Sequence, residues 1–238
     1  MPTVSRALGL VVLGMLAVQP AASAAPKTEK SEKEDAREVT GSWSIAGVAP
    51  DGKAYSGTAT VARIGGEMYR TTWTVAGKIL HGLCFRDGDV MSCGSSPSKD
   101  LGVMAYLIRD DATLDGVWFE ENHGSLGVER LSGGPQTLGG SWTIKHGESP
   151  NKTKYGGTVE IEVRSSVYTL SWHLGSSVSK HTFKGIGLRS GDVLSVGFND
   201  GTEFGVAQYR VSKSGRILSG TSTQAQQKGI AVETLSRP

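Results

Sequence analysis

The chain contains one sequence pattern twice, and this repeat constrains the fold more than any other feature. Gly41-Ser42-Trp43 returns as Gly140-Ser141-Trp142, and Gly88-Asp89-Val90 returns as Gly191-Asp192-Val193. The separation is 99 residues for the first motif and 103 for the second, so it changes only slightly along the repeat. A period of this length indicates two tandem domains, because solenoid repeats have about 20–50 residues per unit. The repeated residues are mostly glycine, aromatic and aliphatic, which specifies architecture and not chemistry.

Residues 1–24 have the features of a signal peptide. Arg6 precedes an apolar run from residue 7 to residue 18, and Ala22-Ser23-Ala24 provides small residues for cleavage. The run is shorter than the roughly 20 residues of a membrane-spanning helix, and no later segment is apolar enough. We therefore expect an exported chain, periplasmic or secreted, without a membrane span. Residues 25–38 are nearly all charged or small, which predicts a flexible tether.

The two repeats, residues 39–133 and 137–238, are predicted to be all-β. In the second repeat, Thr158–Val163 alternates strictly between polar and apolar residues, and Asn199-Asp200-Gly201 marks a turn. About eight short runs of this kind fill the repeat, and none has the apolar period of a helix. Because sequential antiparallel strands leave two unpaired edges, we expect each repeat to close into a small meander barrel. Two β-sandwiches are the alternative fold.

The two cysteines are expected to form a disulfide, because the chain is predicted to be exported. If Gly88-Asp89 is a two-residue hairpin loop, Cys84 lies opposite Cys93 on the neighbouring strand. The second repeat has Gly187 and Val196 at these positions, so the bridge belongs to the first repeat alone. We interpret it as structural, since no Cys-x-x-Cys motif is present.

Several classes of chemistry have no sequence signal. The formal net charge of +2 gives no basic field for nucleic acid. The five histidines lack a usual metal-ligand spacing, and neither a phosphate-binding loop nor a dinucleotide fingerprint is present. Two Ser-x-x-Lys matches, at residues 96–99 and 177–180, lie in segments that look like loops. We therefore predict no cofactor, no metal and no catalytic residue.

Two repeated carboxylates, Glu129 and Glu233, occupy equivalent positions near the ends of the repeats. The favoured interpretation is structural: each is hydrogen-bonded to backbone or paired with an arginine. The alternative is a carboxylate in a pocket, where burial raises the pKa. An enzymatic function requires this alternative.

Aromatic residues are the main candidates for ligand contacts. Tyr69 and Trp73 are four residues apart, as are Tyr168 and Trp172, so each pair lies on one face of a strand. Inside a small barrel such rings either stack on a ligand or fill the core. Their presence in both repeats favours packing, because packing is what both repeats need.

Trp118 differs from these pairs because the second repeat has Ser222 at the same position. The fold therefore does not require an aromatic residue there. We expect Trp118 to contact a ligand or partner, together with Phe119, His173 and the segment from Gly175 to Lys180.

The Gly-x-Trp start of each repeat, followed by short strands, resembles the calycin-type barrels: avidin, the lipocalins and small bacterial periplasmic inhibitors. The longer pattern is similar to repeats in uncharacterised exported bacterial proteins, sometimes labelled fibronectin-binding. This resemblance covers both repeats and implies a barrel fold, with no established site to transfer. In the second repeat it is carried by Tyr155-Gly156-Gly157-Thr158, Tyr168 and Trp172, Gly185-Ile186-Gly187-Leu188, Gly191-Asp192-Val193-Leu194, Gly205-Val206 with Tyr209, and Gly220.

These observations favour an exported, non-enzymatic binding protein. Its ligand is expected to be a periplasmic or extracellular protein or a small apolar molecule. The alternative hypothesis is a periplasmic inhibitor of a hydrolase, such as a protease or lysozyme, because rigidly held loops suit that function.

Overall fold

The computed structural model describes residues 38–121, 125–176 and 179–237, and every helix or strand in these ranges is a β-strand. The predicted signal peptide and nearly all of the predicted tether lie outside the described residues. The strands are β1 (Gly41–Val48), β2 (Ala54–Gly65), β3 (Met68–Val75), β4 (Lys78–Asp87), β5 (Val90–Ser96), β6 (Gly102–Ile108), β7 (Leu114–Glu120), β8 (Gly127–Ser132), β9 (Gly140–Glu148), β10 (Lys154–Arg164), β11 (Val167–Ser176), β12 (Ser179–Ser190), β13 (Val193–Asn199), β14 (Gly205–Val211), β15 (Ile217–Gln224) and β16 (Ala231–Ser236).

The strands form two closed barrels of eight antiparallel strands each. This confirms the predicted all-β barrel fold, and the described strands form no two-sheet sandwich. The eight strands predicted in the second repeat are all present, as β9 to β16. Closure pairs every strand on both sides, which removes the exposed edges that eight sequential strands otherwise leave.

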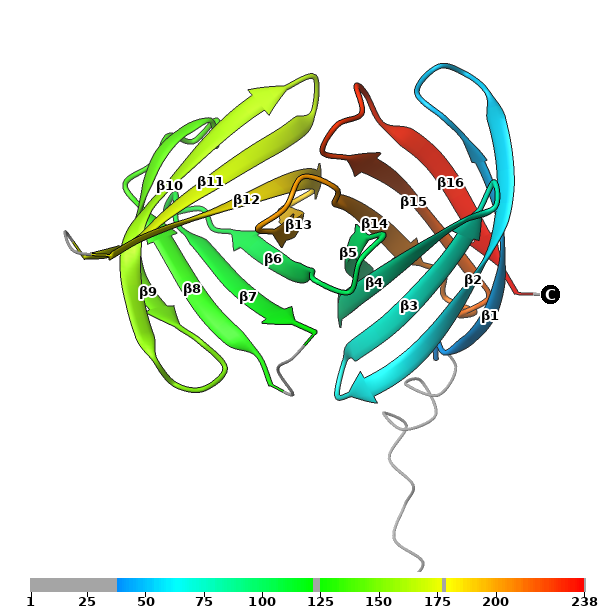
Figure 1. Ribbon diagram of the computed structural model, residues 1–238, viewed down its shortest axis with the longest axis horizontal. Helices are drawn as coiled ribbons and strands as arrows, with labels where there is room; N and C mark the ends of the chain where they lie inside the picture. The colour runs from blue at the N-terminus through cyan, green and yellow to red at the C-terminus, as the bar shows by residue number, and fades with distance from the viewer. Residues whose placement is uncertain (1–37, 122–124, 177–178, 238) are drawn as a thin grey trace, which may run out of the picture.

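The two barrels do not coincide with the two sequence repeats, which corrects the expectation that each repeat closes on itself. Barrel 1 consists of β1–β5 and β14–β16, and barrel 2 consists of β6–β13. In Figure 1 barrel 2 lies on the left and barrel 1 on the right. The boundaries 39–133 and 137–238 therefore describe the repeats, while barrel 2 is a continuous segment inserted between β5 and β14 of barrel 1. Each barrel combines five strands of one repeat with three of the other.

An approximate two-fold symmetry relates the barrels where β5 and β13 cross. Ser92 and Ser195 occupy equivalent positions in the two repeats, and their hydroxyl oxygens are 2.6 Å apart in a buried hydrogen bond. Gly94 and Gly197 are also equivalent, and a Cβ added to Gly197 would lie 3.2 Å from the Gly94 Cα. Contacts between equivalent positions are the mark of a two-fold interface. Any larger side chain at either glycine would force the strands apart.

Two small apolar clusters fill the interface on either side of this crossing. In one, Leu83 of β4 packs with Leu101, Val103 and Phe119; in the other, Ile186 and Leu188 of β12 pack with Phe204 and Val206. Leu101 and Phe204 lie in the two segments that connect the barrels, and both are buried. Burial of these two side chains anchors the connecting segments in the crossed arrangement.

Each barrel is filled at one end by the tryptophan of its Gly-x-Trp motif. Trp43 and Trp142 are 1% exposed, and their indole nitrogens donate to the carbonyl oxygens of Val39 and Leu138, in each case at 2.9 Å. The buried indole N–H is thereby satisfied by a residue that precedes the first strand. The other end of each barrel is where a cavity opens.

The disulfide between Cys84 and Cys93 is confirmed, with the two residues directly opposite each other on β4 and β5 and their Cα atoms 4.0 Å apart. Asp87 pairs with Val90, so the predicted two-residue hairpin loop is also correct. A disulfide fits an oxidising environment. No helix long and apolar enough to cross a membrane occurs in the described ranges.

Candidate functional site

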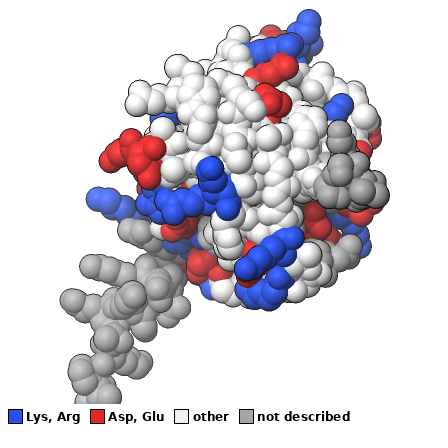
Figure 2. Space-filling view, turned by 90° about the vertical axis from the view of Figure 1, so that its left-hand side faces the viewer, with Lys and Arg blue, Asp and Glu red and all other residues white. Residues whose placement is uncertain are grey.

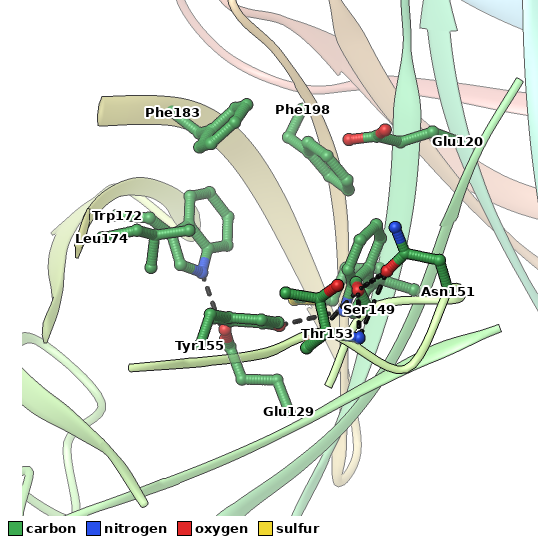
Figure 3. A pocket seen from close by; sticks show the side chains of 12 residues that line it. Glu120, Glu129, Ser149, Asn151, Thr153, Tyr155, Trp172, Leu174, Phe183 and Phe198 are labelled. Carbon is green, nitrogen blue, oxygen red and sulfur yellow. Dashed lines mark hydrogen bonds between the residues drawn. The ribbon is translucent and has the colours of Figure 1, made fainter. Parts of the chain in front are cut away.

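Barrel 2 contains a cavity of about 370 Å³ at the end opposite Trp142. It opens beside the turn that joins β9 to β10, where Ser149, Asn151 and Thr153 form the rim. Figure 3 shows Phe183, Phe198 and Glu120 across the open space from Tyr155 and Thr153. The other lining residues are Met104, Trp118, Glu129, Trp172 and Leu174. Because of the exchanged strands, both repeats contribute to this one cavity.

The aromatic walls of the cavity lie flat over glycines on neighbouring strands. Trp118 pairs with Gly127 across the β7–β8 ladder, and a Cβ on that glycine would be 2.4 Å from the indole Cε2. The absence of a side chain on the facing residue therefore allows each ring to cover the neighbouring strand. The same arrangement places Phe198 over Gly102, Tyr155 over Gly147, Trp172 over Gly185 and Tyr106 over Gly116.

The base of the cavity is a buried carboxylate that accepts several hydrogen bonds. Glu129 is 2% exposed, and its Oε1 accepts bonds from the Tyr106 hydroxyl and, at 3.1 Å, from Trp172 Nε1. Burial raises the pKa of Glu129 above its usual value, although hydrogen bonds from Tyr106, Trp172 and Tyr155 oppose that rise. Burial and the nearby Glu129 charge also raise the pKa of the Tyr155 hydroxyl, so this group stays a protonated donor at neutral pH.

Trp118 forms one side of the cavity mouth and is held by polar and ring contacts. Its Nε1 donates to the Tyr155 hydroxyl at 3.0 Å. Its ring meets those of Tyr155 and Phe198 edge-on, with centroids 6.3 and 6.2 Å away. The side chain is half-buried, so it leaves apolar surface at the opening.

Barrel 1 has an equivalent but smaller cavity of about 220 Å³. Glu233, 6% exposed, takes the place of Glu129. It accepts hydrogen bonds from the Tyr55 hydroxyl at 2.8 Å and from the Tyr209 hydroxyl at 2.7 Å. Trp73 and Ser222 also line this cavity. The carboxylate and its two tyrosines are therefore common to both barrels.

The mouths of the two cavities differ in size and polarity. Where barrel 2 has Trp118 and Phe198, barrel 1 has Ser222 and Ser95. The residue paired with Ser222 is Ala231 rather than the glycine that lies beneath Trp118. A glycine thus lies opposite the large ring in barrel 2, and an alanine lies opposite the small serine in barrel 1. Only barrel 2 of the two has a strongly aromatic opening.

The predicted aromatic pairs divide between two environments. Trp73 and Trp172 line the cavities of barrels 1 and 2. Tyr69 and Tyr168 lie in the hydrophobic cores, outside the cavity linings. Four residues along a strand span about 13 Å, so members of one pair share a face but lie at different depths. Trp118 lines the barrel 2 cavity. The sequence had singled it out as a ligand contact because the second repeat has Ser222 at the equivalent position.

Other predicted contacts are placed elsewhere. Phe119 is 1% exposed in an interface cluster between the barrels, so its prediction as a partner contact is wrong. His173 is exposed on β11. The expected long loop from Gly175 to Lys180 is instead the tip of the β11–β12 hairpin, of which residues 177–178 lie outside the described ranges. No group of three His, Cys, Asp or Glu side chains in the described ranges is placed to hold a metal ion.

The repeated glutamates have a different environment from the one favoured by sequence. The tyrosine hydroxyls bind both carboxylates, whereas backbone or arginine partners were expected. Several glycines within the strands face aromatic rings, which the sequence did not predict. The available signal was a glycine opposite an aromatic residue on the next strand, as for Gly127 and Trp118 or Gly147 and Tyr155. This signal can be recognised only once the strand pairing is known.

The charged side chains give no evident docking surface on the barrel 2 side of the molecule. Figure 2 shows acidic and basic groups interspersed around a centre that carries neither.

No protein-family model, curated protein or solved structure matches the chain. The cavities are therefore the features on which a functional argument rests.

Proposed function

We propose that the chain is an exported, non-enzymatic protein that binds a small, largely apolar ligand in the cavity of barrel 2. The observation that carries the proposal is the aromatic opening formed by Trp118 and Phe198 above a buried carboxylate. The cavity volume of about 370 Å³ lies in the range of roughly 300–1,000 Å³ typical of small-molecule sites. Its lining of rings with few polar groups is typical of such sites as well.

The difference between the barrels supports a ligand rather than simple packing. If Trp118 and Phe198 served only to fill the fold, barrel 1 would need rings at the same positions, yet it has two serines there. Trp118 also leaves apolar surface at the opening, where solvent contact is unfavourable. A bound apolar ligand removes that surface from water.

Glu129 supports binding more than catalysis, despite its raised pKa. Its carboxylate accepts hydrogen bonds from Tyr106, Trp172 and Tyr155, all contributed by the barrel itself. A general base needs a free lone pair directed at the substrate proton. We interpret Glu129 as the group that fixes the orientation of the aromatic side chains around the cavity.

Fluorescence titration with N-phenyl-1-naphthylamine, an apolar dye, tests the proposal. The Trp118→Ser variant gives barrel 2 the residue that barrel 1 has. If the dye covers about a third of an indole's roughly 150–250 Å², the loss at about 25 cal/mol/Å² is about 1.5 kcal/mol, or tenfold in affinity. Ser222→Ala, at the equivalent position of barrel 1, is the control and should bind as the parent does.

Equal dye affinity in the parent and in Trp118→Ser, with both folded by circular dichroism, would contradict the proposal. Native mass spectrometry of the exported chain from residue 25 onward provides a second test. An additional retained mass identifies a resident ligand. The bare mass, less two hydrogens for the disulfide, combined with no dye binding would direct the search to protein partners, including hydrolases.

Export into the periplasm or beyond is part of the proposal. It is supported by the sequence of residues 1–24 and by the Cys84–Cys93 disulfide, which forms readily outside the cytosol. Fractionation of cells that express the full chain tests it: the processed protein is expected outside the cytoplasm, with cleavage after Ala24.

A further inference from the structure

The charged side chains that line the barrel 2 cavity are all acidic. Glu129 lies at its base and Glu120 at its mouth, and the described residues of the lining include no lysine, arginine or histidine. A second anion in this space is disfavoured, because like charges repel strongly where water is scarce. The cavity therefore selects by charge for a neutral or a positively charged ligand.

Five aromatic side chains also line the cavity: Trp118, Tyr155, Trp172, Phe183 and Phe198. The Phe198 ring is inclined by 74° to Trp118 and by 52° to Trp172, with centroids 6.2 and 5.9 Å away. Rings at such angles surround a space instead of stacking on one another. The face of an aromatic ring attracts a cation, and several rings around one space are the usual site for a quaternary ammonium group.

Strand pairing places Glu120 beside one of these rings. Gly102 of β6 pairs with Glu120 of β7 on one side and with Phe198 of β13 on the other. The Phe198 ring lies over this glycine, since a Cβ there would be 2.2 Å from the ring Cζ. Figure 3 shows the Glu120 carboxylate directed toward the Phe198 ring. Two groups that attract a cation are thereby brought to the same part of the mouth.

The equivalent row of barrel 1 has neither the ring nor the carboxylate. It consists of Ser95, Gly205 and Gln224. The glutamine side chain lies over the glycine, with its Nε2 2.7 Å from the position of an added Cβ. In barrel 2 a ring covers the glycine and a carboxylate replaces the amide. Together with Trp118 and its counterpart Ser222, the two rings and the carboxylate are present in one barrel and absent from the other. Packing of the fold alone does not require these three differences to occur together.

The approach to the mouth is acidic as well. A hollow of about 210 Å³ shares Glu120 and two phenylalanines with the cavity. Its other charged residues are three acids and one base: Asp100, Glu121, Asp200 and Lys99. Arg70 pairs with Glu121 at 2.7 Å, and acidic groups still outnumber basic ones among the described residues there. A negative approach raises the local concentration of cations and their rate of association.

We infer that the barrel 2 cavity takes a small organic cation, with its apolar part among the rings and its ammonium group against Glu120. The inference rests on the proposed function, binding of a small, largely apolar ligand in this cavity, and adds the charge of that ligand. An alkylated ammonium fits both, because its charge is surrounded by apolar carbon.

Titration with choline and two analogues of similar shape tests the inference. Choline has a trimethylammonium group, 3,3-dimethylbutan-1-ol has carbon in place of the charged nitrogen, and 3,3-dimethylbutanoate is negatively charged. Nuclear magnetic resonance of the exported chain with ¹⁵N-labelled tryptophan reports binding through the indole signals, which single Trp→Phe variants assign. Trp118 and Trp172 line the site, and Trp73 of the barrel 1 cavity is the internal reference.

Choline should shift the Trp118 and Trp172 signals in a saturable way. It should bind about tenfold or more tightly than the alcohol, the difference expected for a cation held by rings away from water. The anion should not bind. Glu120→Gln gives barrel 2 the residue of barrel 1 and should weaken choline binding about three- to tenfold, with the affinity for the alcohol unchanged. Gln224→Glu, the reverse exchange in barrel 1, adds a carboxylate without the rings and should leave choline binding as in the parent.

Equal affinities for choline and the alcohol would overturn the inference, as would an unchanged choline affinity in Glu120→Gln. A choline shift confined to Trp73 would also overturn it, because the cation would then lie in barrel 1. N-phenyl-1-naphthylamine separates these failures from failure of the proposed function. If the dye binds and choline does not, the cavity takes an uncharged ligand and the proposed function stands. If the dye, choline and the alcohol all fail to bind, both proposals fail.

Discussion

Barrel 2 should fold when it is separated from the rest of the chain, whereas the second sequence repeat should not remain a closed monomer. The segment 100–200 contains all eight strands of barrel 2 in sequence order. The segment 137–238 has nearly the same length but contains five strands of barrel 2 and three of barrel 1. The two segments therefore form a matched pair that differs only in whether its strands belong to one barrel.

The stability lost by segment 100–200 follows from the interface it uncovers. Five apolar side chains that are at most 5% exposed in the whole chain lose the cover of barrel 1: Leu101, Val103, Phe119, Ile186 and Leu188. Full burial contributes roughly 1.5–3 kcal/mol for each side chain. If barrel 1 supplies about half of that burial, the total loss is about 4–8 kcal/mol. The internal core of barrel 2 is retained, so the segment should fold with a lower free energy of unfolding.

Segment 137–238 should recover its missing strand pairs by exchange with a second copy. In the whole chain, β9 and β13 pair with β8 and β6, and β14 and β16 pair with β5 and β1, none of which this segment contains. Because the missing strands are the repeat equivalents of those present, two copies can rebuild both barrels. We expect a dimer that dissociates only on unfolding.

Size-exclusion chromatography with light scattering, followed by urea unfolding monitored by circular dichroism, measures both expectations. Segment 100–200 should be monomeric and cooperative, and segment 137–238 dimeric with a midpoint that depends on protein concentration. If segment 137–238 is instead the more stable monomer, the sequence repeat is the folding unit. Barrels built from strands of both repeats would then not be the more stable arrangement, and our reasoning would be refuted.

Three further changes have defined outcomes. Replacing Cys84 and Cys93 with alanine should lower the free energy of unfolding by roughly 2–3 kcal/mol, because the short loop between them is no longer closed; unchanged urea midpoints would show that the hairpin alone holds this register. Since burial raises the Glu129 pKa, the native state holds its proton to higher pH than the unfolded state does. The free energy of unfolding should therefore fall as the pH rises above about 4.5, by at most about 1.4 kcal/mol per pH unit. Glu129→Gln should remove this pH-dependent loss. If the free energy of unfolding depends on pH in the same way for parent and variant from pH 4 to 8, the expectation is wrong. Gly127→Ala should displace Trp118 from the cavity mouth, because the new methyl would lie 2.4 Å from its ring. We expect a cost of about 1–3 kcal/mol and weaker dye binding, and a parental affinity would show that this wall does not touch the dye.

Much of the local structure is determined by the sequence. Short apolar or alternating runs between turn residues predicted every strand of the second repeat. Strands such as β10 and β16 bury one face and expose the other, whereas β13 and β14 lie at the interface between the barrels and are buried on both faces. The Gly88-Asp89 turn fixed the register that places Cys84 opposite Cys93. Comparison of the repeats identified Trp118 as a ring that the fold does not need. All of these inferences rest on interactions between residues close in sequence or at equivalent positions.

The sequence did not predict the exchange of strands between the repeats, because equivalent strands of the two repeats offer the same pairing partners. β6 and β14 are equivalent strands, so β13 and β5 find the same kind of partner in either. Local pattern cannot choose between two closures with matching ladders. The choice depends on the interface, where Leu101 and Phe204 bury the connecting segments and Gly94 and Gly197 let the strands cross closely.

The candidate sites show the same division. The sequence determined which rings point inward, since period-two alternation assigns each residue to a face. Only the tertiary structure decided their depth, which separates Trp73 from Tyr69, and their partners, which join Trp118 of one repeat to Tyr155 of the other. The depth and the partners depend on how the barrels close, and closure is a property of strands more than 100 residues apart in the case of β5 and β14. The local sequence does not determine whether a barrel closes within one repeat or across both, because the two repeats are similar at the positions that close the barrels.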